Sequence, residues 1–146
     1  MMNFKIKIGI AFVLTIFANV AFGQKDSLNT DWNKIIVGKW MNKIDRTLDG
    51  KEYAGLSCRD TIQYISNGKY ISKQCVWNET GKWKLSEKGD KIIHFDIDNE
   101  YWKKELGTDD LGEANCKIIS LTESELVTQL FSEDVGEIHQ YYIRLE

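Results

Sequence analysis

The sequence predicts an all-β domain, an eight-stranded antiparallel up-and-down barrel preceded by a short N-terminal helical turn. Three observations predict it. After Lys34, apolar and polar residues alternate with a period of two, as in strands that bury one face. Turn-forming residues interrupt this alternation about every ten positions. Finally, Asn67-Gly68 stands between two alternating runs, and this pair is the strongest short-range signal for a β-hairpin.

The beginning of the chain has the layout of a cleavable secretory signal peptide. Lys5 and Lys7 precede an apolar run at residues 8–17, and small residues follow at Ala21 and Gly23. The alternative is a membrane anchor, which needs about 20 predominantly apolar residues, and this run is shorter. The cleavage site lacks the cysteine that a lipid anchor requires. We therefore expect an exported protein.

Cleavage after Gly23 defines a signal peptide at 1–23 and one domain at 24–146, of 146 minus 23 or 123 residues. The whole chain has 19 Lys and Arg against 22 Asp and Glu; without the two signal lysines the formal charge is 17 minus 22, or −5. This acidic balance gives no electrostatic footprint for nucleic acid or anionic membrane. We expect a periplasmic or secreted domain with no nucleic-acid partner and no stable membrane insertion after cleavage.

Eight strands are expected, each bounded by turn residues. They lie at about 36–45, 56–65, 69–77, 81–86, a stretch around 93–98, 116–121, 125–132 and 137–145. In the fifth strand, Ile93, Phe95 and Ile97 alternate with polar residues, so these three are expected to face inward. Closure removes strand edges that would otherwise pair between molecules, which favours a barrel over the alternative, a β-sandwich.

Two segments lie outside the strand pattern. Residues 24–34 are mostly polar and include N-cap candidates at 29–31, which predicts the short helical turn. Residues 99–115 form a long connection, and connections of more than about 12 residues in compact domains are often lids or binding loops. We expect either a lid over the barrel mouth, with Trp102 as a plug, or a mobile surface excursion.

Three cysteines in an exported chain permit one disulfide and one remaining thiol. Cys58 and Cys75 flank the predicted hairpin and are the expected pair; closing this loop would stabilise the fold by roughly 3 kcal/mol on the chain-entropy model. They share a face if Asn67-Gly68 forms a two-residue turn, and they take opposite faces if the turn is bulged. Cys116 is then a free thiol or a rival partner.

Gly38-Lys39-Trp40 opens the first strand directly after the helical turn, and Arg144 lies in the last strand. This arrangement resembles lipocalin-like domains, in which a Gly-x-Trp motif starts strand one and its Trp packs under an Arg from the closing end of the barrel. The resemblance implies a structural pair, with the cation of Arg144 over the indole of Trp40. Three further stretches resemble small bacterial lipocalin-like domains: Tyr64–Tyr70, Gly81–Leu85 and Ser120–Leu126.

The sequence offers little for catalysis or metal binding. Both histidines, His94 and His139, are expected on the wet faces of strands, and no Ser-His or Cys-His pair has a recognisable spacing. Zinc-ligand spacing is also missing, and the acidic run from Asp96 lacks the glycine and glutamate that an EF-hand needs at its sixth and twelfth positions. We expect no catalytic residue, no metal and no cofactor.

An eight-stranded barrel is just wide enough to fill with side chains or to hold one small ligand. The aromatic residues expected to line a pocket are Tyr64, Tyr70, Trp83, Phe95, Trp102 and Tyr142. They lead to the hypothesis of a non-catalytic, lipocalin-like binding protein for a small, partly apolar ligand, hydrophobic or amphipathic. The alternative is a filled barrel that binds another envelope protein or a glycan. An enzyme would need His94 or His139 to meet a carboxylate in a cleft.

Overall fold

The computed structural model describes residues 32–54, 60–133 and 135–145. The predicted signal peptide and the N-cap candidates at 29–31 lie outside these ranges, so both stay predictions. In the ranges that are described, no helix is long and apolar enough to cross a membrane.

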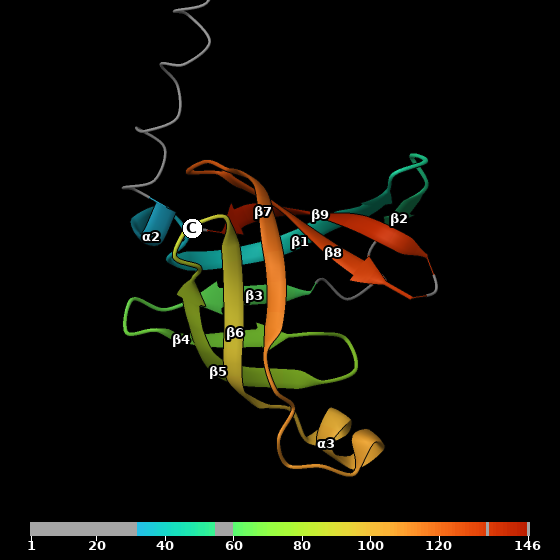
Figure 1. Ribbon diagram of the computed structural model, residues 1–146. Coiled ribbons are helices and arrows are strands. Elements are labelled where there is room, and N and C mark those ends of the chain that lie inside the picture. The colour runs from blue at the N-terminus through green and yellow to red at the C-terminus, as the bar shows by residue number, and fades with distance from the viewer. Residues whose placement is uncertain (1–31, 55–59, 134, 146) are drawn as a thin grey trace, which may run out of the picture. The chain divides into compact units, whose positions relative to one another are not determined.

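The described chain forms a closed barrel (Figure 1). The elements in chain order are α2 Trp32–Ile35, β1 Gly38–Thr47, β2 Glu52–Ala54, β3 Thr61–Tyr64, β4 Lys69–Lys73, β5 Asn78–Leu85, β6 Lys91–Asp98, α3 Glu100–Leu106, β7 Ala114–Leu121, β8 Glu125–Ser132 and β9 Gly136–Leu145. β1 and β3 to β9 pair antiparallel in sequence order, and β9 pairs with β1. The predicted eight-stranded barrel with a short N-terminal helix is therefore confirmed, and the sandwich alternative is wrong.

β2 is an extra strand that the sequence pattern did not predict. It pairs with the far half of β1, where Ile44 faces Ala54, and β3 pairs with the near half, where Met41 faces Thr61. The β1–β2 and β1–β3 pairings do not share one register. If the β1–β2 register continued along β1, Met41 would face position 57, whereas it faces Thr61. Of the strand predicted at 56–65, the structure describes residues 61–64 as β3.

The β3–β4 hairpin has the bulged turn, one of the two forms that the sequence left open. Tyr64 faces Tyr70, which leaves a three-residue loop between Ile65 and Lys69. The Ile65 N–H donates to the Lys69 carbonyl, and the Gly68 N–H donates to the Ile65 carbonyl. Gly68 has a φ of 80°, a left-handed conformation that glycine adopts without steric cost.

Cys75 is disulfide-bonded, and Cys116 is a free cysteine. The β3–β4 ladder ends at Lys73, before Cys75, so the register of the hairpin does not decide which face Cys75 takes. Cys58, its predicted partner, lies outside the described residues. The Cys58–Cys75 pair therefore stays a prediction, whereas Cys116 is settled as a thiol.

In β6, the residues that face the barrel interior differ from those that the sequence predicted. His94 is buried inside the barrel at 7% exposure, whereas Phe95 is half-buried on the outer face. The ladder sets this phase, because His94 faces the buried Trp83 of β5. Outside, the Lys84 ammonium lies 5.0 Å from the Phe95 ring centre, so outward side chains cover the apolar positions. The predicted inward positions of Ile93 and Phe95 and the predicted wet-face position of His94 are wrong.

The long connection predicted after β6 contains the helix α3, which the sequence pattern did not predict. Asn99 is the N-cap, and its side-chain oxygen accepts the Trp102 N–H at 3.2 Å. Gly107 ends the helix with a φ of 65°, and its N–H donates to the Lys103 carbonyl. The helix therefore has a sequence signal at each end.

A hydrophobic core fills the barrel end next to α2. Trp40 is fully buried there, and its indole N–H donates to the Ile36 carbonyl at 2.8 Å. The guanidinium carbon of Arg144 lies 5.2 Å from the Trp40 ring centre, and its N–H groups donate to the carbonyls of Ile35 and Val37. The other buried apolar residues of this core are Ile36, Tyr64, Tyr70, Trp83, Ile92, Ile118, Leu121 and Leu126.

Gly38 makes room for this arginine. Its φ is 151°, and a Cβ built on it would lie 2.7 Å from Nη2 of Arg144. A side chain at position 38 would therefore strain the backbone and displace the guanidinium. This contact explains why glycine stands two residues before Trp40.

Candidate functional site

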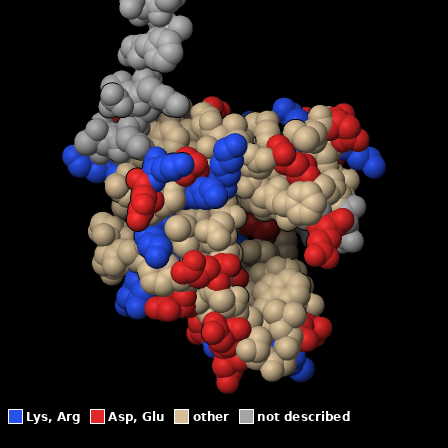
Figure 2. Space-filling view, viewed as in Figure 1, with Lys and Arg blue, Asp and Glu red and all other residues tan. Residues whose placement is uncertain are grey.

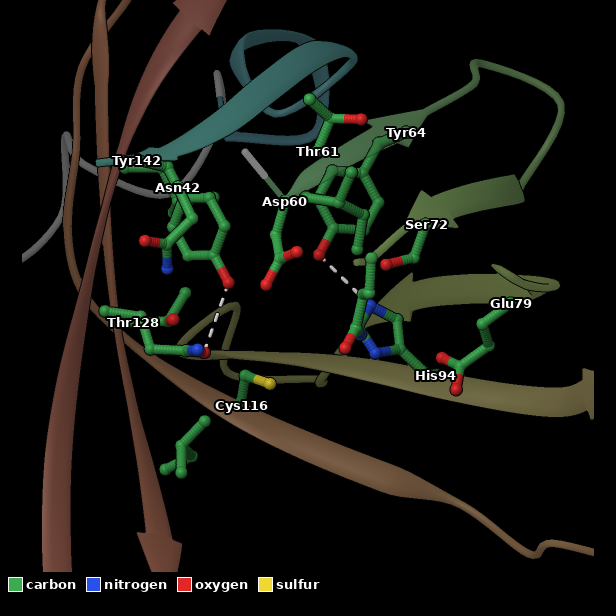
Figure 3. A pocket seen from close by; sticks show the side chains of 15 residues that line it. Asn42, Asp60, Thr61, Tyr64, Ser72, Glu79, His94, Cys116, Thr128 and Tyr142 are labelled. Atoms are coloured by element: carbon green, nitrogen blue, oxygen red, sulfur yellow. Dashed lines mark hydrogen bonds between the residues drawn. The ribbon is translucent and has the colours of Figure 1, made fainter. Parts of the chain in front are cut away.

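The other end of the barrel is hollow and contains a cavity of about 320 Å³. The molecule is hollowed on the face seen in Figure 2, and acidic side chains are visible inside the hollow. Each of the eight barrel strands gives at least one residue to the cavity wall (Figure 3). Carboxyl, amide, hydroxyl, thiol and imidazole groups form most of this wall, and its aliphatic residues are Ile62, Leu126 and Leu130.

The structure brings some of the six predicted wall residues to the cavity and leaves others away from it. The two that line the cavity are Tyr64 and Tyr142. The two that belong to the neighbouring core are Tyr70 and Trp83. The two that lie outside the barrel interior are Phe95 and Trp102.

His94 contributes a hydrogen-bonded imidazole to the wall. Its Nε2 lies 3.1 Å from the Tyr64 hydroxyl oxygen, and its ring stacks on Tyr70 with centroids 4.4 Å apart. Burial lowers the pKa of His94 to about 4, so the imidazole is neutral at pH 7. His94 therefore gives the cavity a polar group without a positive charge.

Glu79 is held in the wall by two neutral donors. The Tyr70 hydroxyl donates to its Oε1 at 2.8 Å, and the Asn99 side-chain amide donates to its Oε2 at 3.0 Å. Burial and then the charge of Glu79 raise the pKa of Tyr70 well above its ordinary value. Asn99 is 1% exposed and also caps α3, so a single side chain joins the cavity wall to this helix.

Replacing Asn99 by alanine should lower the free energy of unfolding by about 2 kcal/mol, because it removes both the helix cap and a hydrogen bond to a carboxylate. Urea unfolding measures the loss. Asn115→Ala is the control, since Asn115 is exposed at the start of β7 and should cost about 0.5 kcal/mol or less. Equal losses in the two variants would contradict the bridging role of Asn99.

A second carboxyl group in the wall belongs to Asp60. Its Oδ1 accepts the Cys75 N–H at 3.1 Å. Next to it on β1, Asp45 accepts a hydrogen bond from the Asn42 amide at 2.7 Å. Burial raises the pKa of Asp45, and the nearby charge of Asp60 adds to the rise. Acidic groups thus act on one another across this part of the barrel.

The thiol of Cys116 also lines the cavity. Burial, reinforced by the charge of Glu79, raises the pKa of Cys116 to about 11, so the group is a protonated thiol at neutral pH. Among the residues that the structure describes, no group of three or more His, Cys, Asp or Glu side chains is placed to hold a metal ion. The wall supplies hydrogen bonds and acidic charge, without an activated thiolate.

Three aromatic residues outside the barrel, Trp77, Tyr101 and Trp102, form what we call the outer aromatic cluster. Trp77 stacks on Tyr101 with centroids 5.1 Å apart, and Trp102 meets both rings edge-on. Tyr101 is 43% exposed and Trp102 is 38% exposed. Because Trp102 packs in this cluster and is not part of the cavity wall, it does not plug the cavity as the lid hypothesis expected.

The polar half of the wall was missed by sequence reasoning, although two signals pointed to it. Ser72 lies two residues after Tyr70, and Glu79 lies four residues before Trp83. The period of two that places these aromatic residues inside therefore places Ser72 and Glu79 inside as well. The N-cap pattern at Asn99 was the second signal.

No protein-family model and no curated protein matches this sequence. Among solved structures, the chain is similar to a lipocalin-like protein from Bacteroides uniformis, with a TM-score of 0.54 and 14% identity over 76% of this chain and 99% of that one. It is also similar to a redesigned β-barrel, with a TM-score of 0.50 and 11% identity over 78% and 95% of the two chains. Identities this low concern the fold alone. The described chain folds as a lipocalin-like β-barrel domain.

Proposed function

We propose that this protein is an exported, non-catalytic binding protein that holds a small, partly apolar ligand inside the barrel. The observation that carries the proposal is the cavity of about 320 Å³, walled by all eight strands. Ligand pockets commonly start at about 300 Å³ and combine apolar surface with a few polar groups that fix orientation. Here the rings of Tyr64 and Tyr142 and the side chain of Leu126 supply apolar surface.

Two features of the wall support binding without catalysis. Cys116 is a protonated thiol at neutral pH, so it is a poor nucleophile. Nε2 of His94 is engaged with the Tyr64 hydroxyl, and its neutral imidazole is thus partnered by a phenol rather than by a carboxylate. A nucleophile and a base directed at each other are the usual requirement for covalent catalysis.

The outer aromatic cluster supports a second candidate function, the binding of a glycan on the outside of the barrel. Exposed aromatic rings offer flat apolar surface, and polar residues surround this cluster in a shallow groove, among them Asn78, Asp98 and Glu100. Flat apolar surface bordered by polar groups suits the faces and hydroxyls of a sugar. This function does not use the cavity.

Native mass spectrometry of the protein from its own host tests the first proposal. We expect a chain that begins at Gln24, with an adduct of a few hundred daltons that is lost on denaturation. Thr128→Phe should abolish the adduct, because Thr128 is 3% exposed and lines the cavity. Gln129→Phe adds the same ring on the outer face of β8 and should retain the adduct.

Two results would reject the cavity as the binding site. One is a bare mass, with no displacement of an apolar dye by host extracts. The other is an adduct that survives Thr128→Phe but is lost in Trp102→Ala, which would transfer the function to the outer aromatic cluster. A chain that begins at Met1 would reject export through signal cleavage.

A further inference from the structure

The cavity has an uncompensated negative charge. Asp60 and Glu79 line it, and the part of the wall that the structure describes contains no Lys or Arg. His94, the remaining basic side chain of this wall, is neutral at pH 7. Asp96 and Asp98, which do form ion pairs with lysines, have exposed side chains.

Neutral donors orient Glu79 without cancelling its charge. The Tyr70 hydroxyl and the Asn99 amide each donate one hydrogen bond to it. A carboxylate oxygen accepts more than one hydrogen bond, so Glu79 retains acceptor capacity toward the cavity. Two hydrogen bonds thus orient this carboxylate, which can accept a further hydrogen bond from a ligand.

The pKa values of four neighbouring groups also reflect the acidic charge of the cavity. Burial is the main cause that raises the pKa of Tyr64, Tyr70, Cys116 and Tyr142, and acidic neighbours raise each of them further. These acidic neighbours add to the cost of placing a negative charge in the interior.

Two buried hydroxyl groups also face the cavity. Ser72 is 6% exposed and Thr128 is 3% exposed, and both line the wall (Figure 3). Neither side chain makes a hydrogen bond to another described residue. Because these hydroxyls open onto the cavity, a ligand or water there can complete their hydrogen bonds. Ser72 stands directly opposite Glu79 in the β4–β5 ladder, which places a hydroxyl beside the carboxylate.

We propose that the ligand is a small organic cation with a primary ammonium group, bound with its nitrogen beside Glu79 and Ser72 and its apolar part against Tyr64 and Tyr142. This inference rests on the proposed function, because it names the chemistry of the molecule in the same cavity. An ammonium has three N–H donors and no acceptor, which matches a wall of carboxylate and hydroxyl acceptors. An anion would face two carboxylates, and a neutral ligand would leave their charge unpaired.

Three probes of one shape and different charge test the proposal. Tyramine is a cation, 4-propylphenol replaces its ammonium by methyl, and 3-(4-hydroxyphenyl)propionate replaces it by carboxylate. Binding to the mature chain is measured by isothermal titration calorimetry at pH 7, after ligand has been removed by unfolding and refolding with the disulfide intact. We expect tyramine to bind at least about tenfold more tightly than 4-propylphenol, and the propionate to bind weakest.

Matched variants test whether the carboxylates of Glu79 and Asp60 bind the ammonium group. Glu79→Gln should weaken tyramine about tenfold and change 4-propylphenol by about twofold or less. Asp60→Asn keeps the oxygen that accepts the Cys75 N–H and should also weaken tyramine selectively, so the test holds even if Glu79→Gln does not fold. Glu87→Gln makes the same change of net charge at an exposed turn and should leave all three affinities unchanged.

The outcomes separate the two proposals. Equal or tighter binding of 4-propylphenol overturns the cation inference and leaves the binding function standing. A tyramine preference that persists in both Glu79→Gln and Asp60→Asn also overturns it, because the charge would then lie elsewhere. If none of the three probes binds the wild-type chain, the proposed function and the inference fail together.

Discussion

Replacing Trp40 by alanine should lower the free energy of unfolding by about 3–5 kcal/mol, the usual cost of truncating a fully buried tryptophan. Trp40 is 0% exposed, and the change removes its hydrogen bond to Ile36 and the ring beneath Arg144. Because small domains have about 5–15 kcal/mol of stability in total, this loss is a large part of it. Equilibrium unfolding in urea, followed by far-ultraviolet circular dichroism, measures the change.

Trp102→Ala is the matched control. It deletes the same side chain from the outer aromatic cluster, where Trp102 is 38% exposed, and should cost about 1 kcal/mol or less. Trp40→Phe serves if Trp40→Ala does not fold, since it retains most of the ring volume and loses the N–H. If the Trp40 variant is no less stable than the Trp102 variant, the packing of Trp40 against Arg144 does not contribute to stability as we expect.

Acid should destabilise the protein through His94. Its pKa is about 4 in the folded state against 6.5 as the ordinary value, so the unfolded chain binds the proton more readily between these pH values. The stability associated with the neutral imidazole is fully present above pH 6.5 and is lost as the pH falls through about 4. At 1.36 kcal/mol for each pKa unit, the loss is about 3 kcal/mol.

His94→Gln isolates this effect, because it keeps an amide to meet the Tyr64 hydroxyl and removes the titration. We expect the stability difference between wild type and His94→Gln to change by about 3 kcal/mol from pH 7 to pH 4, measured by urea unfolding at each pH. His139→Gln, which removes the histidine bonded to Glu137 on the outer face, should keep the acid sensitivity of the wild type. If His94→Gln and wild type lose stability in parallel, the buried histidine is not the cause.

The barrel could be predicted from sequence because its signals are local. Strand alternation, the Asn67-Gly68 hairpin and the Gly38-Lys39-Trp40 motif each depend on a few neighbouring residues. Turn type was harder, because a two-residue turn and a bulged turn use the same Asn-Gly pair, and only the Tyr64–Tyr70 pairing distinguishes them. β2 escaped detection because it is short and carries charge at Glu52.

The candidate site could not be predicted to the same extent, because the pattern method assumes a dry, apolar interior. In β6, Ile93 and Phe95 face outward, where the Lys84 side chain lies over the Phe95 ring, and His94 faces the cavity. A polar cavity reverses the usual relation between hydrophobicity and burial. In such a strand, the pairing with the neighbouring strand decides which residues face inward. Here His94 pairs with the buried Trp83, and this pairing cannot be inferred from the sequence.

Closure of the barrel by β1 and β9 also determines when the cavity comes into existence during folding. The Arg144 side chain donates a hydrogen bond to the carbonyl of Val37, 107 positions away, so this contact joins the two ends of the domain. Contacts this distant in sequence form late and slowly, because the entropy of closing the loop is lost before any contact compensates for it. Before β9 pairs with β1, the wall of the barrel is open along this edge. The cavity is therefore complete only when the last strand, β9, pairs with β1.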